Sequence, residues 1–248
     1  MPKILLGTPT YDRSVTVDYV QSLLAAKREL NGVDLRPLFV TRTAIQKARN
    51  FFATRVLDDT SFTHLLFIDA DMGFRPQAIQ RMLDFDKDFV GCVAPQRSID
   101  LDRFHEIARQ VEDPRKARLV AQNYASSALI RTDLGDGRSG YVATDGFVRA
   151  QQVGMGLTLI KRSVLEAMRA ATPELLVTLA SGERTFQAFE PTPDNAGVYL
   201  SEDLSFCHRW RAIGGDIWVC VDEIITHVGV MAYEGLFAER LAFESRSP

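Results

Sequence analysis

The stretch that decides the fold is His64-Leu65-Leu66-Phe67-Ile68-Asp69-Ala70-Asp71-Met72. An apolar run of this length, closed by two acids and Gly73, predicts a strand buried on both faces in a parallel sheet. Open α/β sheets bind ligands at the carboxyl ends of their strands, where Asp69 and Asp71 offer oxygens to a divalent cation. The first hypothesis is metal-assisted handling of a diphosphate. The alternative is that the two acids only terminate the strand and cap the next element of the chain.

Length and charge bound the class of protein. The chain has 248 residues, of which 46% are hydrophobic, so it can form one large domain or two small ones around a substantial core. Its 29 basic and 32 acidic side chains leave a net charge of −3. The net charge therefore gives no reason to expect binding to nucleic acid or to an anionic membrane.

The cysteines and the N-terminus predict a location. Cys92, Cys207 and Cys220 are too few and too scattered for a disulfide framework, and no Cys-x-x-Cys pair suggests zinc. The N-terminal apolar run reaches Gly7 and Pro9 too soon for a signal peptide, and no later run approaches about 18 apolar residues. We expect buried thiols in a soluble, cytoplasmic protein without a transmembrane segment.

Strand and helix patterns alternate in the first part of the chain, which predicts right-handed βαβ units. The order is strand 3–6, helix 14–30, strand 33–40, helix from Thr43, the strand from His64, helix from Pro76 and strand 89–94. The apolar positions at helical spacing are Val17, Val20, Leu23, Leu24 and Leu30 in the first helix, and Ile45, Ala48, Phe52 and Val56 in the second. Asn31-Gly32 would end the first helix, and Thr43 with Gln46 would form a capping box for the second.

The second half is predicted as a continuation of the same domain. The pattern degrades into charged and small residues over 96–140, which predicts an insertion or loop region. Periodicity returns at 147–160, followed by a helix with a Ser163/Glu166 capping box, a strand near 186–189, a helix with Ser201 as N-cap, a strand at 216–221 and the segment 224–229. We expect a single domain, 1–248. Its parts are a nucleotide-binding half 1–95, the variable segment 96–140, an acceptor and catalytic half 141–230 and a tail 231–248.

Three later residues could carry chemistry. Glu202 and Asp203 stand in a first helical turn, where acids are stabilised by the helix dipole without any other role. Alternatively one of them, preferably Asp203, is a general base that deprotonates a sugar hydroxyl. His227 is either an ordinary histidine after an apolar strand or an imidazole that completes the metal site of Asp71.

Taken in order, these motifs resemble a known family. The motifs are Thr8-Pro9-Thr10-Tyr11-Asp12, Ala48-Arg49-Asn50, Phe67-Ile68-Asp69-Ala70-Asp71-Met72, Ser201-Glu202-Asp203 followed by Phe206 and Arg209-Trp210, and His227. They resemble the GT-A-fold nucleotide-sugar glycosyltransferases, particularly family-2-like enzymes. The resemblance implies an α/β fold with a mixed, mostly parallel sheet flanked by helices. It also implies a hexosyltransferase-like activity on a UDP- or GDP-sugar donor.

The resemblance assigns a role to each matching position. Thr8, Pro9, Thr10, Tyr11 and Asp12 would hold the base and ribose, with Arg49 and Ala70 beside the nucleotide, and Gly154 and Gly156 beside the donor sugar. Asp71 and His227 would bind Mn²⁺ or Mg²⁺ on the diphosphate, and Asp69 would contact the metal or the ribose. Asp203, next to Glu202, would be the base of an inverting enzyme. A cation at the leaving diphosphate stabilises the negative charge that develops there.

The acceptor and the oligomeric state stay open. The resemblance leaves a glycan, protein, lipid or nucleic acid open as acceptor, but the family often carries a membrane anchor that is not expected here, which disfavours a membrane lipid. The basic residues of the variable segment would suit an anionic acceptor or form an ordinary solvated surface. They are Arg97, Arg103, Arg109, Arg115, Lys116 and Arg118.

Two other classes of function compete. In a phosphohydrolase of the haloacid-dehalogenase type, Asp69 would be the nucleophile, Asp71 the acid/base, Lys161 a phosphate ligand and Glu202/Asp203 the distal acids. Its nucleophile normally follows the first strand, whereas two predicted strands precede Asp69. In a non-catalytic nucleotide-sugar-binding module, the metal site would persist without turnover and no base would be needed.

Overall fold

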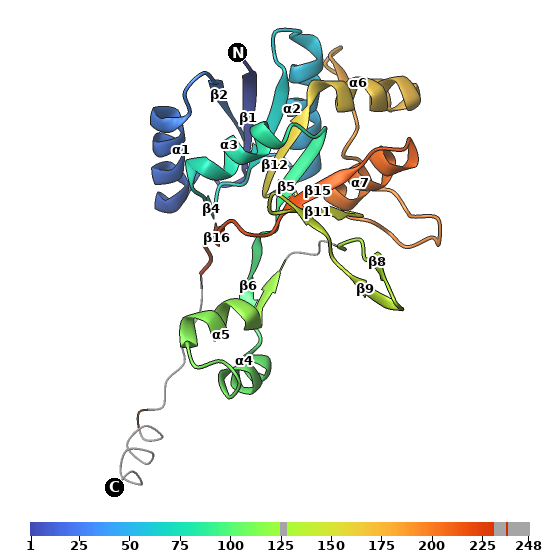
Figure 1. Cartoon of the computed structure of the whole chain (residues 1–248). Coiled ribbons are helices and arrows are strands. Elements are labelled where there is room, and N and C mark those ends of the chain that lie inside the picture. Colours follow the sequence, from blue (N-terminus) through green and yellow to red (C-terminus); the bar gives the residue numbers. More distant parts are fainter. Residues whose placement is uncertain (125–127, 231–236, 238–248) are drawn as a thin grey trace, which may run out of the picture.

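A single eight-stranded sheet forms the centre of the molecule (Figure 1). The computed structural model describes residues 1–124, 128–230 and 237. The order of strands in the sheet is β10-β11-β15-β5-β12-β3-β1-β2. Strands β11 and β12 run against the other six, so the sheet is mixed but has one dominant direction.

The strands of this sheet come from both halves of the chain. They are β1 (Lys3–Thr10), β2 (Asp34–Thr41), β3 (His64–Ile68), β5 (Phe89–Cys92), β10 (Ala143–Thr144), β11 (Phe147–Ala150), β12 (Leu157–Lys161) and β15 (Ile217–Cys220). The short β4 (Met72–Gly73) and β16 (Thr226–His227) pair with each other, as do β13 (Leu176–Thr178) and β14 (Arg184–Phe186).

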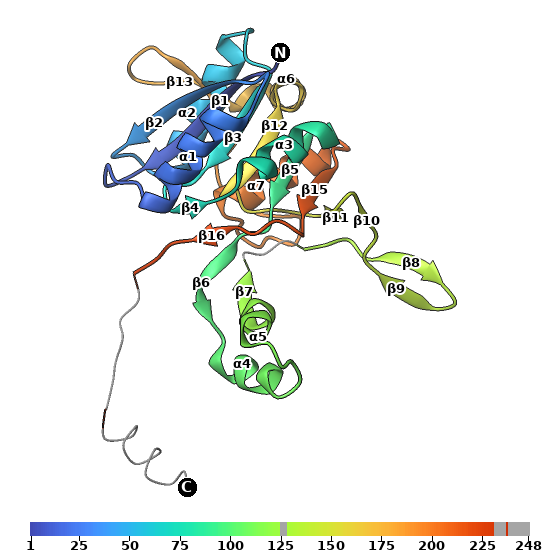
Figure 2. The same ribbon diagram turned by 60° about the vertical axis from the view of Figure 1, so that its left-hand side comes forward.

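Helices cover both faces of the sheet (Figures 1 and 2). One face carries α1 (Val17–Glu29) and α3 (Pro76–Phe85), and the other carries α2 (Ile45–Asp58), α6 (Arg162–Ala171) and α7 (Glu202–Ala212). A short 3-10 helix, Pro173–Leu175, follows α6. Two apolar cores result: one joins Tyr19 and Met82 to the sheet, and the other joins Phe52, Leu165 and Phe206 to its opposite face. The strand from His64 is buried on both faces as predicted, because Leu65 to Ile68 are fully buried between these cores, but the sheet around it is mixed, since β12 pairs with it antiparallel.

Residues 95–124 form an arm that projects from the body (Figure 1). Strands β6 (Pro95–Ile99) and β7 (Gln122–Tyr124) pair at its base, and α4 (Leu101–Ala108) and α5 (Pro114–Ala121) pack at its far end. A separate hairpin of β8 (Thr132–Gly135) and β9 (Arg138–Gly140) extends beside it (Figure 2). Residues 96–140, predicted as an insertion or loop region, therefore contain regular helices and strands. Asp100 and Asp113 cap the two helices through their carboxylates, a signal present in the sequence.

Several local predictions are corrected by the structure. Strand β1 continues to Thr10 instead of stopping at Leu6, because β2 pairs with it along its whole length. β3 pairs with β1 only as far as Gly7, so one edge of β1 is free where Pro9 lacks an N–H. In α1 the buried face is Tyr19, Ser22 and Ala26. Val17 and Leu24, on the predicted apolar face, are exposed.

The two predicted capping boxes do not form. Helix α2 begins after Ala44, and no side chain caps it; Thr43 lies one residue too early. Helix α6 begins at Arg162, whose guanidinium pairs with Glu166 at 2.6 Å and so takes the carboxylate that the box required. Ser201 does stand at the N-cap of α7, as predicted, without a side-chain hydrogen bond.

Three further expectations concern cysteines, membranes and the tail. All three cysteines are free and buried, as predicted. In the parts of the chain that the structure describes, no helix combines the length and apolar character needed to span a membrane. The predicted tail 231–248 lies outside the described residues except for Phe237.

Gly7 allows β1 and α2 to approach closely, and this gives a stability prediction. A Cβ at Gly7 would lie 2.7–3.0 Å from ring atoms of Phe52, which is fully buried on α2. We expect Gly7→Ala to lower the free energy of unfolding by about 1–3 kcal/mol through overpacking. Urea denaturation of Gly7→Ala, Phe52→Leu and the double variant would measure it. We expect the double variant to lose less unfolding free energy than the sum of the losses of the two single variants. Strictly additive losses would contradict the close approach of Gly7 to Phe52.

Candidate active site

A cavity lies at the carboxyl ends of β1, β2 and β3, where the order of strands reverses. The chain passes from β1 to β2 on one side and then returns to β3 on the other side of β1. Such a switch point is where open α/β sheets bind ligands. The cavity has a volume of about 650 Å³, within the range of small-molecule sites. Its lining comes from the segments 9–12, 14–16, 43–45, 69–71 and 228–230 and from Arg97.

The loop after β1 supplies one wall of this cavity. Pro9, Thr10, Tyr11 and Asp12 line it, and the Tyr11 side chain is largely exposed beside it. The Asp12 carboxylate accepts a hydrogen bond from the backbone N–H of Ser14, at 3.1 Å, which fixes the turn. Ala44 and Ile45 bring the N-terminus of α2 to the same wall, and exposed N–H groups at a helix N-terminus favour anions.

Thr8 is placed differently from its neighbours. Its side chain is fully buried, and its hydroxyl lies 2.6 Å from the hydroxyl of Tyr19 in α1. Thr8 does not line the cavity. It ties β1 to α1 beneath the loop, so its side chain is a support of the wall.

Asp71 and His227 lie side by side although 156 positions separate them in the chain. The pairing of β16 with β4 sets His227 opposite Met72, and the Val228 N–H donates to the Asp71 carbonyl at 2.9 Å. The resulting distance from His227 Nε2 to Asp71 Oδ2 is 3.2 Å. The antiparallel β4–β16 ladder thus brings His227 next to Asp71, which lines the cavity together with Val228.

The orientation of the His227 ring suits a metal ligand. Its Nδ1 lies 2.8 Å from the carbonyl oxygen of Pro95, which can only accept, so Nδ1 carries the hydrogen. In the neutral ring the lone pair is then on Nε2, directed at the Asp71 carboxylate, and metal-binding histidines are commonly fixed through their other nitrogen in this way. Asp71 and His227 therefore fit Mn²⁺ or Mg²⁺ as a pair of ligands. Within the described residues no group of three or more His, Cys, Asp or Glu is close enough to hold a metal alone. A metal ion bound by Asp71 and His227 would therefore need further ligands from groups other than these side chains.

Behind the cavity, Arg49 is surrounded by three carboxylates. Its side chain is only 2% exposed, and its nitrogens lie 2.9 Å from Asp203 Oδ1, 3.6 Å from Asp69 Oδ1 and 3.7 Å from Glu202 Oε1. The guanidinium also lies over the ring of Phe67, 5.4 Å from its centroid. Helix α2 supplies Arg49, the end of β3 supplies Asp69, and the first turn of α7 supplies the two other acids. We call these four residues the acid cluster.

The acid cluster has unused hydrogen-bonding capacity. Among the described residues, Arg49 Nε and Nη1, Asp69 Oδ1 and Asp203 Oδ1 are buried without a hydrogen bond of good geometry. The short Nη1–Oδ1 distance between Arg49 and Asp203 is thus an ion pair whose angles are poor for a hydrogen bond. Buried polar atoms left in this state cost free energy and are typical of functional sites.

The electrostatics of the acid cluster follow from burial and charge. Burial raises the pKa of Asp69 to about 6, against the opposing effect of the Arg49 charge. Burial also raises the pKa of Glu202, and the neighbouring Asp203 charge acts in the same direction. Burial by itself lowers the pKa of Arg49, but the three carboxylates, Asp203 foremost, outweigh it and raise that pKa. Asp69 belongs both to the acid cluster and to the cavity lining, whereas Arg49, Glu202 and Asp203 do not line the cavity.

The segment that contains Gly154 and Gly156, which the resemblance places beside the donor sugar, supports the acid cluster. The Met155 N–H donates to Asp203 Oδ2 at 3.0 Å, and the Asp69 N–H donates to the Gly156 carbonyl at 3.0 Å. A Cβ at Gly156 would lie 2.5 Å from Met72 Cε, so the glycine allows the end of the Met72 side chain to pack against it. Gly154 and Gly156 do not line the cavity.

Lys161, the phosphate ligand of the phosphohydrolase alternative, lies elsewhere. Strand β12 is antiparallel to β3, and its register pairs Lys161 with His64, at the opposite end of β3 from Asp69. The Lys161 ammonium donates to the Asp86 carbonyl and pairs with the Asp86 and Asp88 carboxylates. That part of the alternative is wrong.

Sequence reasoning missed part of the cavity lining. Arg97 was predicted only as a member of a basic segment, yet its Nη1 lies 3.2 Å from Asp71 Oδ2. Its position shortly after β5, a strand parallel to β15 and directed to the same edge of the sheet, was a signal that could have indicated this. The segments 14–16, 43–45 and 228–230 carry no such signal, because loop residues converge only through the tertiary fold.

Comparisons with known proteins identify the fold. No protein-family model matches the chain, and no curated protein matches its sequence. Among solved structures, the crystal structure of A197 from STIV matches with a TM-score of 0.51 and 14% identity, covering 93% of this chain and 87% of that one. The inositol-1-phosphate CTP transferase from T. maritima matches with a TM-score of 0.43 and 12% identity, covering 99% of this chain and 96% of that one. The predicted α/β fold, with a mixed sheet flanked by helices, is confirmed by the structure and is shared with A197 over most of both chains.

Proposed function

We propose that this protein is a metal-dependent glycosyltransferase that moves a sugar from a nucleoside-diphosphate donor to a hydroxyl acceptor. The observation that supports it most strongly is the juxtaposition of Asp71 and His227, 3.2 Å apart, at the edge of a switch-point cavity. Asp69 adds a second element, because it lines the cavity and is linked through Arg49 to Asp203, and transfer to a hydroxyl needs a base near the donor.

Different parts of the cavity lining would contact different parts of a nucleotide-sugar donor. The loop Pro9–Asp12 would hold the base and ribose, with Tyr11 packing on the base. Asp71 and His227 would hold Mn²⁺ or Mg²⁺, whose charge stabilises the negative charge that develops on the leaving diphosphate. Asp69 would contact the ribose or the metal from the same turn. A UDP- or GDP-sugar fits this division equally well.

Asp203 is the general base of the proposal. Its carboxylate would accept the proton of the acceptor hydroxyl while that oxygen attacks the anomeric carbon, and the bond from this carbon to the diphosphate oxygen breaks. Attack from the side opposite the leaving group inverts the configuration. The Met155 N–H and Arg49 hold the carboxylate in place, and Glu202 is its neighbour in the acid cluster.

Incubation of the purified protein with Mn²⁺ and a panel of nucleotide sugars tests the proposal. Slow release of nucleoside diphosphate and free sugar, stopped by EDTA and accelerated by a correct acceptor, is the expected result. Saturable binding with no release would instead identify a non-catalytic nucleotide-sugar-binding module. Hydrolysis of simple phosphate esters with no response to any nucleotide sugar would identify a phosphohydrolase.

A further inference from the structure

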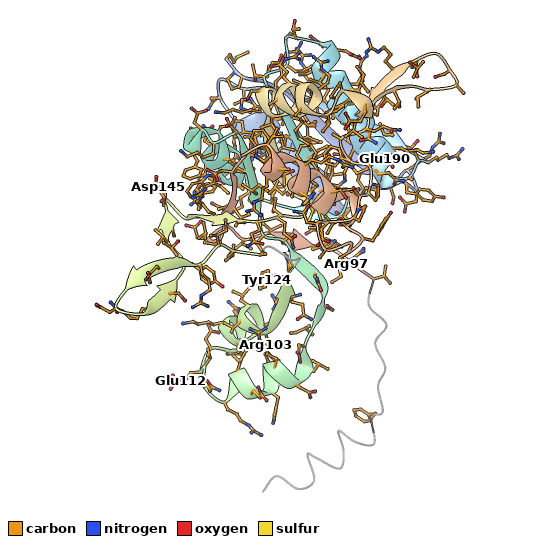
Figure 3. All side chains as sticks on the ribbon, turned by 90° about the vertical axis from the view of Figure 1, so that its right-hand side faces the viewer. Arg97, Arg103, Glu112, Tyr124, Asp145 and Glu190 are labelled. Carbon is orange, nitrogen blue, oxygen red and sulfur yellow. The ribbon has the colours of Figure 1, made fainter. Side chains whose placement is uncertain are left out.

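One oxygen of Asp71 is shared by two side chains from distant parts of the molecule. Asp71 Oδ2 lies 3.2 Å from His227 Nε2 and also 3.2 Å from Arg97 Nη1. Arg97 belongs to β6, at the point where the arm joins the body, as Figure 3 shows. The arm thus delivers a permanent positive charge to the carboxylate that would bind a cation.

The Arg97 side chain has a defined path to this position. A Cβ at Gly229 would lie 2.5 Å from Arg97 Cδ and 2.9 Å from its Cγ, so the glycine leaves room for the arginine stem. Strand β6 pairs with β7 on either side of Arg97, Pro95 opposite Tyr124 and Ile99 opposite Gln122, with a register shift between the two pairs. The guanidinium lines the cavity, and the side chain remains 55% exposed. The stem of Arg97 therefore packs beside Gly229, and its charged end is accessible in the cavity.

Two cations cannot share Asp71 Oδ2 without repulsion. A divalent ion bound to Asp71 and His227 needs the oxygen with which Arg97 pairs, so binding of the ion competes with Arg97. The guanidinium, released within the same cavity, has the charge and the planar donor geometry that phosphate oxygens accept. Arg97 would therefore weaken binding of the free cation and strengthen binding of a diphosphate.

We propose that Arg97 is a diphosphate-binding residue that pairs with Asp71 until a divalent cation arrives with the nucleotide. This inference rests on the proposed donor site and deepens it. Arg97 would make the site prefer a metal–diphosphate complex over either the free metal or the free nucleotide. Only the complex has both a cation that replaces Arg97 at Asp71 and phosphate oxygens that accept hydrogen bonds from the guanidinium. The arm from which Arg97 extends would then contribute directly to donor recognition.

Two titrations of Arg97→Met test the proposal, because the variant is expected to bind more tightly in the first and more weakly in the second. In the first, MnCl₂ alone is added and free Mn²⁺ is followed by electron paramagnetic resonance. In the second, calorimetry follows UDP, GDP, CDP, ADP and dTDP in saturating MnCl₂. We expect Arg97→Met to bind Mn²⁺ alone about threefold more tightly, because an exposed ion pair no longer competes. We expect it to bind the accepted nucleoside diphosphate about tenfold more weakly, because a charge-assisted contact is lost.

Matched variants separate this role from a general one. Arg103→Met removes the same charge from an exposed position in α4, farther along the arm (Figure 3), and is expected to leave both titrations unchanged. Arg97→Lys keeps the charge and loses the planar fork. It should therefore bind Mn²⁺ as the wild type does and bind the nucleotide more weakly.

The outcomes distinguish this inference from the proposed function. If the wild type binds a nucleoside diphosphate with Mn²⁺ but Arg97→Met matches it in both titrations, the role of Arg97 is wrong and the donor site stands. If Arg97→Met weakens both titrations, Arg97 only supports the structure and the inference is also wrong. If the wild type binds none of the five nucleotides, the proposed function fails and the inference fails with it.

Discussion

Asp203→Asn is expected to lower the rate of sugar transfer about 10²- to 10⁴-fold while leaving donor binding nearly unchanged. The amide keeps the shape of the side chain and can still accept from the Met155 N–H through its oxygen, but it cannot accept a proton from the acceptor. The measurement is a transfer assay with the donor identified by the nucleotide-sugar panel. Calorimetry of the same donor in Mn²⁺ is run in parallel.

Glu202→Gln is the matched control for this prediction. Glu202 is the neighbouring acid of the same helical turn, but its closest approach to Arg49 is 3.7 Å, against 2.9 Å for Asp203. We expect Glu202→Gln to lower the rate much less than Asp203→Asn. Transfer at the wild-type rate in Asp203→Asn would remove Asp203 from the mechanism, and a larger loss in Glu202→Gln would move the role of base to Glu202.

Arg49→Met is expected to lower the free energy of unfolding by about 3–5 kcal/mol at neutral pH. The change leaves Asp69, Glu202 and Asp203 close together without a counter-charge, in a region where the arginine itself is only 2% exposed. Removing one member of a buried ionic group is costly because the remaining charges stay desolvated and repel one another. Urea denaturation followed by circular dichroism measures the loss.

Arg55→Met provides the comparison for Arg49→Met. Arg55 lies on the same helix, α2, but is exposed, so its replacement is expected to change stability by no more than about 0.5 kcal/mol. Equal stability of the two variants would show that Arg49 does not hold the acid cluster together. Partial recovery on adding Asp203→Asn to Arg49→Met is also expected, because it removes one unpaired charge.

The central strands could be predicted from sequence because their signals are local. The apolar run of β3 is long, uninterrupted and bounded by acids, and Leu65 to Ile68 are fully buried. Pro76 at the first turn of α3 and the glycines after α7 likewise marked helix ends without tertiary information. The alternation of these elements was enough to indicate the fold class.

The packing face of α1 could not be predicted because tertiary contacts override periodicity. Tyr19 is fully buried, since its hydroxyl meets that of Thr8 and its ring packs against Phe39. Ser22 is buried because its hydroxyl accepts from the Phe74 N–H. Polar residues with such partners displaced the leucines and valines that an apolar pattern favours. The helices of the arm were missed for a different reason: each has only eight residues and buries little apolar surface, so neither stood out from the charged segment around it.

The candidate site was predictable in its residue types but only partly in its grouping. The sequence could place Asp69 and Asp71 at the end of one strand, and the resemblance could add His227 and Asp203. That Arg49 holds Asp203 and Asp69 together, and that Arg97 reaches Asp71, depends on the relative positions of α2, α7 and the arm. These positions are set by the packing of distant elements and leave no mark in local spacing.

The most direct test of the central claim is the melting temperature of the wild type and of Asp71→Ala with the accepted nucleoside diphosphate, in Mn²⁺ and in EDTA. We predict that the wild type gains about 5 °C at a hundredfold excess over Kd only when nucleotide and Mn²⁺ are both present. Asp71→Ala should lose that gain because one of two protein ligands to the cation is gone. A full gain in Asp71→Ala, or in the wild type with EDTA, would contradict a donor site built on Asp71 and His227.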